Sequence, residues 1–467
     1  MPGPAAISEL FAAIVGPEHV FVGDAIPDDY GRDEALTAVP VRPAAVVRPG
    51  STQEVSALLR AADARRVPVT ARGAGTGLSG ACIPRADGIV VSFERMNRVL
   101  EIDEANAVAV VEPGVRLEQL DVELAAHGLV YPVYPGEYSA SLGGNVGTNA
   151  GGMRAVKYGV TRQNVLGVEA VLASGAVIQC GGKLIKASTG YDLTQLLIGS
   201  EGTLALVTQA TLRLQPRLAH GATVLAPFAK LDEVTSAVPR IVASGLAPLM
   251  LEYIDILTMS AMINQLGLKL GIPDAIRAKA LAYLVVSLES ARADRLDQDV
   301  EATGELLGEL GAMDVYVLPP SAAGELIEAR EKAFWVAKAN HADDVIDVVV
   351  PRAAIHAFVA RVAEIAREHE TWIAGCGHAG DGNVHMAIFQ RDPERRSRIL
   401  RRLFEAGIAL GGAISGEHGV GKEKKKHFLA LEDPTKIELM RRIKAAFDPN
   451  GILNPGTILD PAEPART

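Results

Sequence analysis

A glycine-rich loop between two strand-like stretches, RGAGTGLSG at residues 72–80, most constrains what this chain can fold into. The stretches VPVTA before it and GIVVSF after it are short and apolar, which is typical of buried strands. The spacing G-x-G-x-x-G occurs at 75–80, but Pro84 and another strand follow, whereas a Rossmann fingerprint requires a helix to open there. Backbone N–H groups of such a loop can form an anion-binding nest without a helix. We therefore expect the loop to bind a pyrophosphate rather than to be a flexible surface linker.

Two further glycine-rich segments follow in the first half of the chain, at residues 132–152 and 199–204. Small residues dominate the first of them between Ser139 and Gly152, so this loop would let the backbone approach a flat ligand closely. The second leads into the strand-like run LALVTQATLRL. Three such loops separated by strand-like stretches predict one large ligand with a phosphate end and a planar end.

The second half of the chain has a different character, and from about His220 onwards strand-like and helix-like patterns alternate. This alternation predicts an α+β domain. Within it, GCGHAGDGNVH at 375–385 lies between the strand-like runs TWIA and VHMAIF, and Asp381-Gly382 is a two-residue hairpin signal. A hairpin centred on that pair would place His385 directly opposite His378, with Cβ atoms about 4.5–5.5 Å apart. Two imidazoles this close could share a metal ion, or they could be a stacked polar pair.

Other residues of the second half could also carry chemistry. In SGEHGVG at 415–421, Glu417 and His418 are adjacent, so in an extended chain they point in opposite directions and should do different jobs. One could complete a metal site while the other faces a substrate. Arg330 lies on an expected helix, where a lone arginine is more often solvated than bound to substrate. Cys376 is better interpreted as a small buried residue than as a further metal ligand.

Composition limits the classes of partner. A length of 467 residues predicts more than one domain, and a net charge of −10 argues against nucleic acid. The basic run KEKKKH at 422–427 is interpreted as a solvated helix face. The three cysteines are widely spaced, which excludes a disulfide framework and fits a cytoplasmic location. We expect no signal peptide and no transmembrane helix, so any membrane association would come through a partner.

The three glycine-rich segments, in this order and spacing, resemble the FAD-binding domain of the vanillyl-alcohol oxidase/p-cresol methylhydroxylase superfamily. Together with GHAGDGNVH and SGEHGVG, they resemble its 2-hydroxyacid dehydrogenase branch, which includes the flavoprotein subunit of glycolate oxidase, D-lactate dehydrogenase and D-2-hydroxyglutarate dehydrogenase. The resemblance runs from about residue 38 to 457. It implies an α+β chain with a two-subdomain FAD-binding domain of the p-cresol methylhydroxylase type, a ferredoxin-like α+β cap and a C-terminal helical segment that returns to the FAD-binding domain.

The corresponding domain boundaries are an N-terminal segment at 1–37, the FAD-binding domain at 38–217, the cap with the metal site at 218–425 and the C-terminal segment at 426–467. The resemblance implies three groups of FAD contacts. The pyrophosphate loop comprises Arg72, Gly73, Ala74, Gly75, Thr76, Gly77, Ser79 and Gly80. The flavin and ribityl contacts are Pro135, Gly136, Ser141, Leu142, Gly144, Asn145, Thr148 and Gly151. The remaining contacts are Gly202, Thr203, Val207 and Asn454. No histidine or cysteine stands at a recognised flavin-attachment position in these loops, so we expect non-covalent FAD.

The resemblance also assigns the polar residues of the cap. It implies that His378, His385 and Glu417 bind a divalent metal, that His418 is the catalytic base and that Arg330 holds the substrate carboxylate. The implied substrate contacts are Arg330, His378, Glu417 and His418. Three N/O ligands with an open position suit a catalytic ion such as Zn²⁺ or Mn²⁺.

Three departures from the family pattern bear on the ligands. Ala205 replaces a usual glycine near the adenosine side, and Ala387 replaces a frequent asparagine two residues after His385. The hydroxyglutarate type carries a lysine before the family proline, whereas only acids precede Pro351 here, followed by Arg352. A long dicarboxylate is thereby disfavoured, and a shorter or more apolar 2-hydroxy acid is favoured.

The sequence thus predicts an FAD- and metal-dependent dehydrogenase that oxidises a D-2-hydroxy acid, such as D-lactate or glycolate, by hydride transfer to flavin N5. D-2-Hydroxyglutarate dehydrogenase is the nearest alternative. A metal-dependent hydrolase and a non-catalytic flavin-binding subunit are alternatives of other classes. The electron acceptor would be a quinone, an electron-transfer flavoprotein or a partner subunit, and a homodimer is also allowed. The expected location is cytoplasmic, with peripheral attachment to a membrane partner as a variant.

Overall fold

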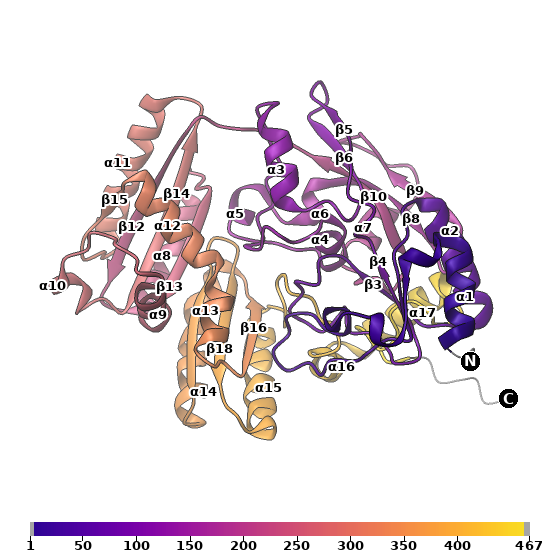
Figure 1. Ribbon diagram of the computed structural model, residues 1–467. Helices are drawn as coiled ribbons and strands as arrows, with labels where there is room; N and C mark the ends of the chain where they lie inside the picture. Colours follow the sequence, from indigo (N-terminus) through magenta and orange to yellow (C-terminus); the bar gives the residue numbers. More distant parts are fainter. Residues whose placement is uncertain (1–3, 462–467) are drawn as a thin grey trace.

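Two sheets form the part of the molecule that carries the glycine-rich loops (Figure 1). The computed structural model describes residues 4–461, so the outermost parts of the expected first and last segments, 1–3 and 462–467, lie outside it. The first sheet has the order β1-β2-β4-β3 and contains β1 (Val20–Phe21), β2 (Ala45–Val47), β3 (Val69–Arg72) and β4 (Ile89–Ser92). Helices α1 (Pro4–Val15) and α2 (Thr52–Arg65) pack on it through one apolar core. Ser51 caps α2 by accepting a hydrogen bond from the Glu54 amide at 3.2 Å.

The second sheet is antiparallel, with the order β5-β6-β10-β8-β9. Its strands are β5 (Val99–Asp103), β6 (Val108–Val111), β8 (Val165–Val171), β9 (Val177–Gly181) and β10 (Leu206–Arg213). A separate two-stranded sheet pairs β7 (Leu129–Val130) with β11 (Gln215–Pro216). The connecting helices are α3 (Leu117–Ala125), α4 (Leu142–Thr148), α5 (Ala155–Tyr158), α6 (Thr161–Asn164) and α7 (Leu193–Leu197).

The expectation that residues 132–152 form a continuous loop is wrong for residues 142–148, which form helix α4. Ser141 caps this helix and accepts a hydrogen bond from the Gly144 amide at 3.4 Å. Glycine normally weakens a helix by about 1 kcal/mol relative to alanine. Here it permits a close approach, because a Cβ atom on Gly143 would lie 2.5 Å from the Pro113 side chain. The first loop behaves as expected, since residues 73–88 contain no helix and β4 follows them.

The second half forms a seven-stranded antiparallel sheet with the order β15-β12-β14-β13-β17-β18-β16. Its strands are β12 (His220–Phe228), β13 (Met250–Asp255), β14 (Ala282–Ser290), β15 (Tyr316–Leu318), β16 (Asp344–Val349), β17 (Trp372–His378) and β18 (Asn383–Phe389). The first four, in chain order, occupy the order 4-1-3-2, which is the ferredoxin-like arrangement that was expected. The last three extend this sheet.

Helices cover both faces of the large sheet. One face packs through an extensive apolar core against α8 (Leu231–Ala243), α11 (Ala293–Glu309), α14 (Ile355–Glu368) and α15 (Pro393–Ala409). The other face packs against α9 (Ile256–Leu266), α12 (Pro320–Glu331) and α13 (Ala333–Ala339), with the short α10 (Asp274–Arg277) nearby in sequence. This second face lies toward the glycine-rich loops, so the site forms between the two halves (Figure 1).

The C-terminal segment returns to the first sheet as expected. It contains α16 (Lys425–Leu431) and α17 (Pro434–Phe447), after which Leu453 bridges to Val69 at the edge of β3. The Asn454 side-chain amide donates to the carbonyls of Ala81 at 2.9 Å and Glu201 at 2.8 Å. Within residues 4–461, we find no helix whose length and apolar character would let it cross a bilayer.

Candidate active site

The glycine-rich loops enclose a cradle with two cavities. A cavity of about 90 Å³ is lined by glycines from α4 and from the third loop, and by Ala205. A more open one of about 470 Å³ lies where Gly73 and Ala74 meet Ser141. The Ala74 amide donates to Ser141 Oγ at 3.2 Å, so the first loop is attached to the start of α4. Together with a third cavity described below, these spaces are lined by Gly73, Ala74, Pro135, Gly136, Ser141, Gly144, Thr148, Gly202 and Val207, all expected FAD contacts.

The other expected FAD contacts lie behind or beside these cavities. Leu142, Thr203 and Asn454 are buried supports, and Gly75, Thr76, Gly77 and Gly80 complete the first loop. The Arg72 guanidinium donates to the Arg32 carbonyl at 2.6 Å and stacks over the Tyr30 ring, so its side chain braces the loop. The Asn145 amide nitrogen and the Ser79 hydroxyl are buried without a hydrogen-bond partner among the described residues. Small lining residues and unpartnered polar atoms in one place fit a flat, phosphate-containing ligand.

The hairpin expected at residues 375–385 is present as β17 and β18, but its register differs from the one expected. His378 pairs with Asn383 and His385 pairs with Cys376, because four residues rather than two separate the paired strands. Gly382 has a φ of 91°, and its amide donates to the His378 carbonyl at 3.1 Å. The histidines are therefore diagonal neighbours on one face, with ring centroids 4.8 Å apart. A shift of two residues keeps both side chains on the same face.

Glu417 lies between the two histidines. Its Oε1 is 3.1 Å from His378 Nε2 and 3.1 Å from His385 Nε2. One ligand atom from each of the three residues lies within 4.8 Å of the others. Burial opposes the charge on Glu417, yet His378 and His385 lower its pKa well below the usual range. Burial lowers the pKa of His385, which keeps that imidazole neutral as a metal ligand must be.

His378 is held from behind by Glu252. His378 Nδ1 is 2.8 Å from Glu252 Oε1, a contact that directs the other ring nitrogen toward Glu417. Burial opposes protonation, but the carboxylates of Glu252 and Glu417 raise the pKa of His378 well above its usual value. If Nδ1 carries the hydrogen, Nε2 and Glu417 Oε1 are two acceptors facing each other. A proton or a metal ion between them resolves this, so the donor set fits a divalent cation.

Arg330 is buried beside this cluster, with its Nη2 2.9 Å from Glu252 Oε2. Two of its guanidinium nitrogens, Nε and Nη2, have no properly aligned hydrogen-bond acceptor among the described residues. A lone arginine on a helix is expected to be exposed to solvent, and this expectation is wrong for Arg330. A buried arginine with free donors can bind a carboxylate through two parallel hydrogen bonds.

The His418 ring lies beside the His378–His385–Glu417 cluster, with its centroid 5.1 Å from that of His385, and its Nδ1 faces Asp347. His418 Nδ1 is 3.2 Å from Asp347 Oδ1. Asp347 is fully buried and accepts hydrogen bonds from the amides of Gly416, Glu417 and His418 at 2.7, 2.7 and 3.1 Å. It therefore fixes the backbone that presents both functional residues. Burial lowers the pKa of His418 to about 4, so the ring is neutral at physiological pH and able to accept a proton.

The basic run at 422–427 is not simply a solvated helix face. Lys424 is 4% exposed and donates to Asp347 Oδ1 at 2.5 Å, and His427 is 6% exposed. Burial opposes the charge on Asp347, yet His418 and Lys424 lower its pKa far below the usual range. Lys424 therefore balances a buried carboxylate.

Three residues that matter for this site were not expected from the sequence: Glu252, Asp347 and Lys424. The sequence contained one signal that could have identified such a residue, namely an acidic residue at an inward-facing position of an apolar strand, as in DVIDVVV. Cys376 is 5% exposed and burial raises its pKa, which agrees with the expectation of a small buried residue.

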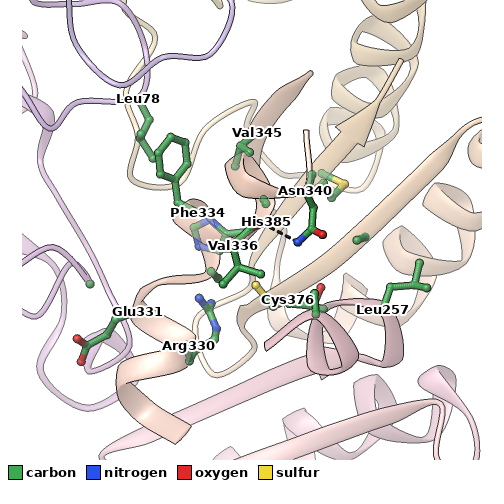
Figure 2. Close-up of a pocket in the computed structure, with 18 of the residues that line it drawn as sticks. Leu78, Leu257, Arg330, Glu331, Phe334, Val336, Asn340, Val345, Cys376 and His385 are labelled. Atoms are coloured by element: carbon green, nitrogen blue, oxygen red, sulfur yellow. Dashed lines mark hydrogen bonds between the residues drawn. The ribbon is translucent and has the colours of Figure 1, made fainter. Parts of the chain in front are cut away.

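A cavity of about 430 Å³ joins these groups to the glycine-rich loops (Figure 2). On one side it is lined by Leu78, Pro135 and Gly136, and on the other by Arg330, His378, His385, Glu417 and His418. Figure 2 shows Arg330 and His385 directed into it. Ala387 lines the cavity, whereas Arg352 is exposed and does not.

Comparisons with known proteins identify the family of both halves of the chain. Residues 43–181 match the family described as FAD binding domain, and residues 217–458 match FAD linked oxidases, C-terminal domain. An uncharacterized FAD-linked oxidoreductase of Mycobacterium tuberculosis is 59% identical, covering 96% of this chain and 98% of that protein. A D-lactate dehydrogenase of Archaeoglobus fulgidus is 38% identical over 92% of this chain and 96% of its own length. The solved structure of p-cresol methylhydroxylase with substrate bound has the same fold, with a TM-score of 0.79, 16% identity and coverage of 98% and 97%.

The fold and the matched domains define an FAD-linked oxidoreductase with the architecture of p-cresol methylhydroxylase. The chain belongs to the FAD-linked oxidase family that contains proteins named D-lactate dehydrogenase, glycolate oxidase subunit and D-2-hydroxyglutarate dehydrogenase. The expected superfamily and the expected class of enzyme are thereby confirmed, and the metal-dependent hydrolase and the non-catalytic subunit are not supported.

Proposed function

We propose that this protein oxidises a D-2-hydroxy acid to the corresponding 2-oxo acid with non-covalent FAD and a divalent metal ion. One observation carries the proposal: His378, His385 and Glu417 cluster beside Arg330 and His418 in a cavity that opens onto the glycine-rich loops. A carboxylate, a hydroxyl and a flavin could therefore meet in one enclosed space. Relatives named D-lactate dehydrogenase and glycolate oxidase subunit support this reaction class.

Different residues would bind the substrate carboxylate and accept the proton of its hydroxyl group. The unpartnered donors of Arg330 would bind the substrate carboxylate, and the buried Glu252 keeps the guanidinium in place. Neutral His418 would accept the proton of the 2-hydroxyl group, with Asp347 positioned to stabilise the resulting imidazolium. The apolar walls of the cavity would limit the access of water to this proton transfer.

His378, His385 and Glu417 would hold the metal ion, and the glycine-rich loops would hold FAD. When bound, Zn²⁺ or Mn²⁺ supplies Lewis acidity at the substrate hydroxyl and FAD supplies a two-electron acceptor. The described residues that line the cavity include one arginine and no lysine. A second carboxylate would therefore lack a cationic partner there, so D-2-hydroxyglutarate is expected to be a poor substrate.

The purified holoprotein tests the proposal. It should show the absorbance of oxidised flavin and retain a divalent metal, and a D-2-hydroxy acid should bleach the flavin anaerobically. Loss of bleaching after metal removal, and its recovery when Zn²⁺ or Mn²⁺ is restored, would support the metal role. A yellow protein that no 2-hydroxy acid bleaches would refute the proposed reaction.

The reduced flavin requires an acceptor, for which we propose a quinone, an electron-transfer flavoprotein or a partner subunit. Three relatives are named glycolate oxidase subunit, which is compatible with a partner subunit. Reoxidation of the bleached protein by each class of acceptor, measured separately, distinguishes the three.

A further inference from the structure

The sheet face that carries the two histidines continues as an apolar surface. Successive pairs across β17 and β18 are His378 with Asn383, Cys376 with His385, Ala374 with Ala387, and Trp372 with Phe389. Alternate residues on a strand share one face, so these four pairs form rows on the cavity side of the hairpin. The rows change from polar to small and apolar, and then to aromatic. All these residues except Asn383 line the same cavity.

The spacing of these rows sets a length. Two residues along a strand advance about 7 Å, so the aromatic row lies roughly 13 Å beyond His385. Glycolate has no carbon beyond the hydroxyl-bearing one, and lactate has a single methyl group. Neither molecule is long enough to extend beyond the row that contains His385. The exposed fraction of Trp372 is 70%, which places the aromatic end at the mouth of the cavity.

The walls above this surface are also apolar. Leu257 and Ala261 come from α9, and Phe334, Val336 and Ala337 come from α13. Val345 of β16 lies directly opposite Ala387. Figure 2 shows Leu257, Val336, Phe334 and Val345 around the cavity.

Two polar side chains in this part each donate one hydrogen bond to a backbone carbonyl, and neither is charged. Thr258 Oγ1 donates to the Gly375 carbonyl at 3.3 Å, and Asn340 Nδ2 donates to the Val336 carbonyl at 2.8 Å. Among the described lining residues, Arg330 is the one with a permanent positive charge, and it lies at the histidine end. The outer part of the cavity therefore offers burial of apolar surface and no charge for a second carboxylate.

We infer that the preferred substrate is a 2-hydroxy acid with an extended apolar side chain, aliphatic or arylalkyl, which lies over Ala374 and Ala387 and extends toward Trp372 and Phe389. This inference rests on the proposed function, because it assumes that the carboxylate and hydroxyl occupy the Arg330 and histidine end. The apolar side chain of the substrate would not occupy the part of the cavity lined by Leu78, Pro135 and Gly136, which faces the glycine-rich loops. The small Ala374–Ala387 pair leaves the space that the chain fills.

The test compares D-2-hydroxy acids of increasing length: glycolate, D-lactate, D-2-hydroxybutyrate, D-2-hydroxyhexanoate, D-2-hydroxyoctanoate and D-3-phenyllactate. Two quantities are measured on the FAD- and metal-loaded protein. The first is kcat/KM from anaerobic flavin bleaching or with an artificial acceptor. The second is the Kd of the matching 2-oxo acids, from the perturbation of the flavin spectrum and the rise in Tm. Binding thus provides a readout that does not require turnover.

We expect both quantities to improve about fourfold for each added methylene, and by roughly 10²–10³-fold from D-lactate to D-2-hydroxyoctanoate. Ala387→Leu fills the middle row, so it should remove most of this gain with chain length. Ala360→Leu makes the same change on the exposed side of α14 and should leave the whole series unaltered. The Tm of each variant without ligand reports whether it folds.

The outcomes separate the inference from the function on which it rests. Kd and kcat/KM that improve with chain length, and lose this trend in Ala387→Leu, support the inference. Bleaching by glycolate or D-lactate with no gain from longer chains overturns it and leaves the proposed function standing. Length-dependent binding without bleaching by any member supports the apolar site and refutes the proposed reaction. If no 2-hydroxy or 2-oxo acid binds or bleaches, both fail.

Discussion

Replacement of Asp347 by asparagine is the sharpest test of how the site is held together. Asparagine has the same shape, and its oxygen can occupy the position of Oδ2, where three loop amides donate. The amide nitrogen then replaces Oδ1, which accepts from Lys424 Nζ at 2.5 Å. Two donors would face each other, and the buried Lys424 charge would lose its partner.

Breaking one side of a buried ion pair costs about 3–5 kcal/mol. We therefore expect Asp347→Asn to reduce the free energy of unfolding by that amount. The double variant Asp347→Asn with Lys424→Met removes both charges and should recover most of the loss. Activity should not recover with stability, because His418 still lacks the carboxylate 3.2 Å from its Nδ1. A loss of about 10–100-fold in kcat/KM is expected in both variants.

The assay measures Tm and denaturant unfolding alongside kcat/KM for the single variants, the double variant and the wild type. A double-mutant cycle isolates the coupling between Asp347 and Lys424. A double variant no more stable than Asp347→Asn alone would refute the charge-pair reasoning. Full activity in the double variant would show that Asp347 supports the fold but does not position His418.

The remaining predictions concern single groups. His385→Ala should lower the bound metal and turnover while FAD stays bound, so loss of the flavin spectrum would contradict separate metal and FAD sites. Arg330→Lys should reduce kcat/KM about 10–100-fold, because lysine cannot reproduce the two parallel donors, and an unchanged value would remove Arg330 from substrate binding. Burial raises the pKa of Glu201 to about 7, so the folded protein binds this proton more tightly than the unfolded chain. The free energy of unfolding of the wild type should therefore fall relative to that of Glu201→Gln between about pH 4.5 and pH 7, by at most ~1.4 kcal/mol per pH unit, whereas a constant difference would show no such titration.

The strands around the first loop could be predicted because local apolar runs determine them, and β3 and β4 lie where expected. Helix α4 could not, because glycine-rich composition argues against a helix. Its stability depends on the Ser141 cap and on packing against Pro113, a contact between residues distant in sequence. Local propensity carries no information about such a contact.

The hairpin at residues 375–385 could also be predicted from the sequence only in part. The Asp-Gly signal indicated a turn at the correct place, but the turn length sets the register, and a four-residue turn moved His385 from opposite His378 to a diagonal position. Both histidines still lie on the same face of the sheet, because strand side chains alternate between the two faces and the register differs by two residues. Asp347 and Glu252 were harder to recognise, because their roles depend on partners far along the chain. Lys424 lies 77 positions from Asp347, and His378 lies 126 positions from Glu252.

The return of the C-terminal segment to β3 has a consequence for biosynthesis. Asn454 holds the end of the first glycine-rich loop through Ala81, which lies 373 positions earlier in the chain. At translation rates of 5–20 residues per second, the loop leaves the ribosome roughly 20–75 s before its clamp exists. The first half of the protein must therefore wait, with its cofactor cradle incomplete, until the last helix has been made. The arrangement that the glycine-rich loops share with Asn454 is therefore complete only in the finished polypeptide.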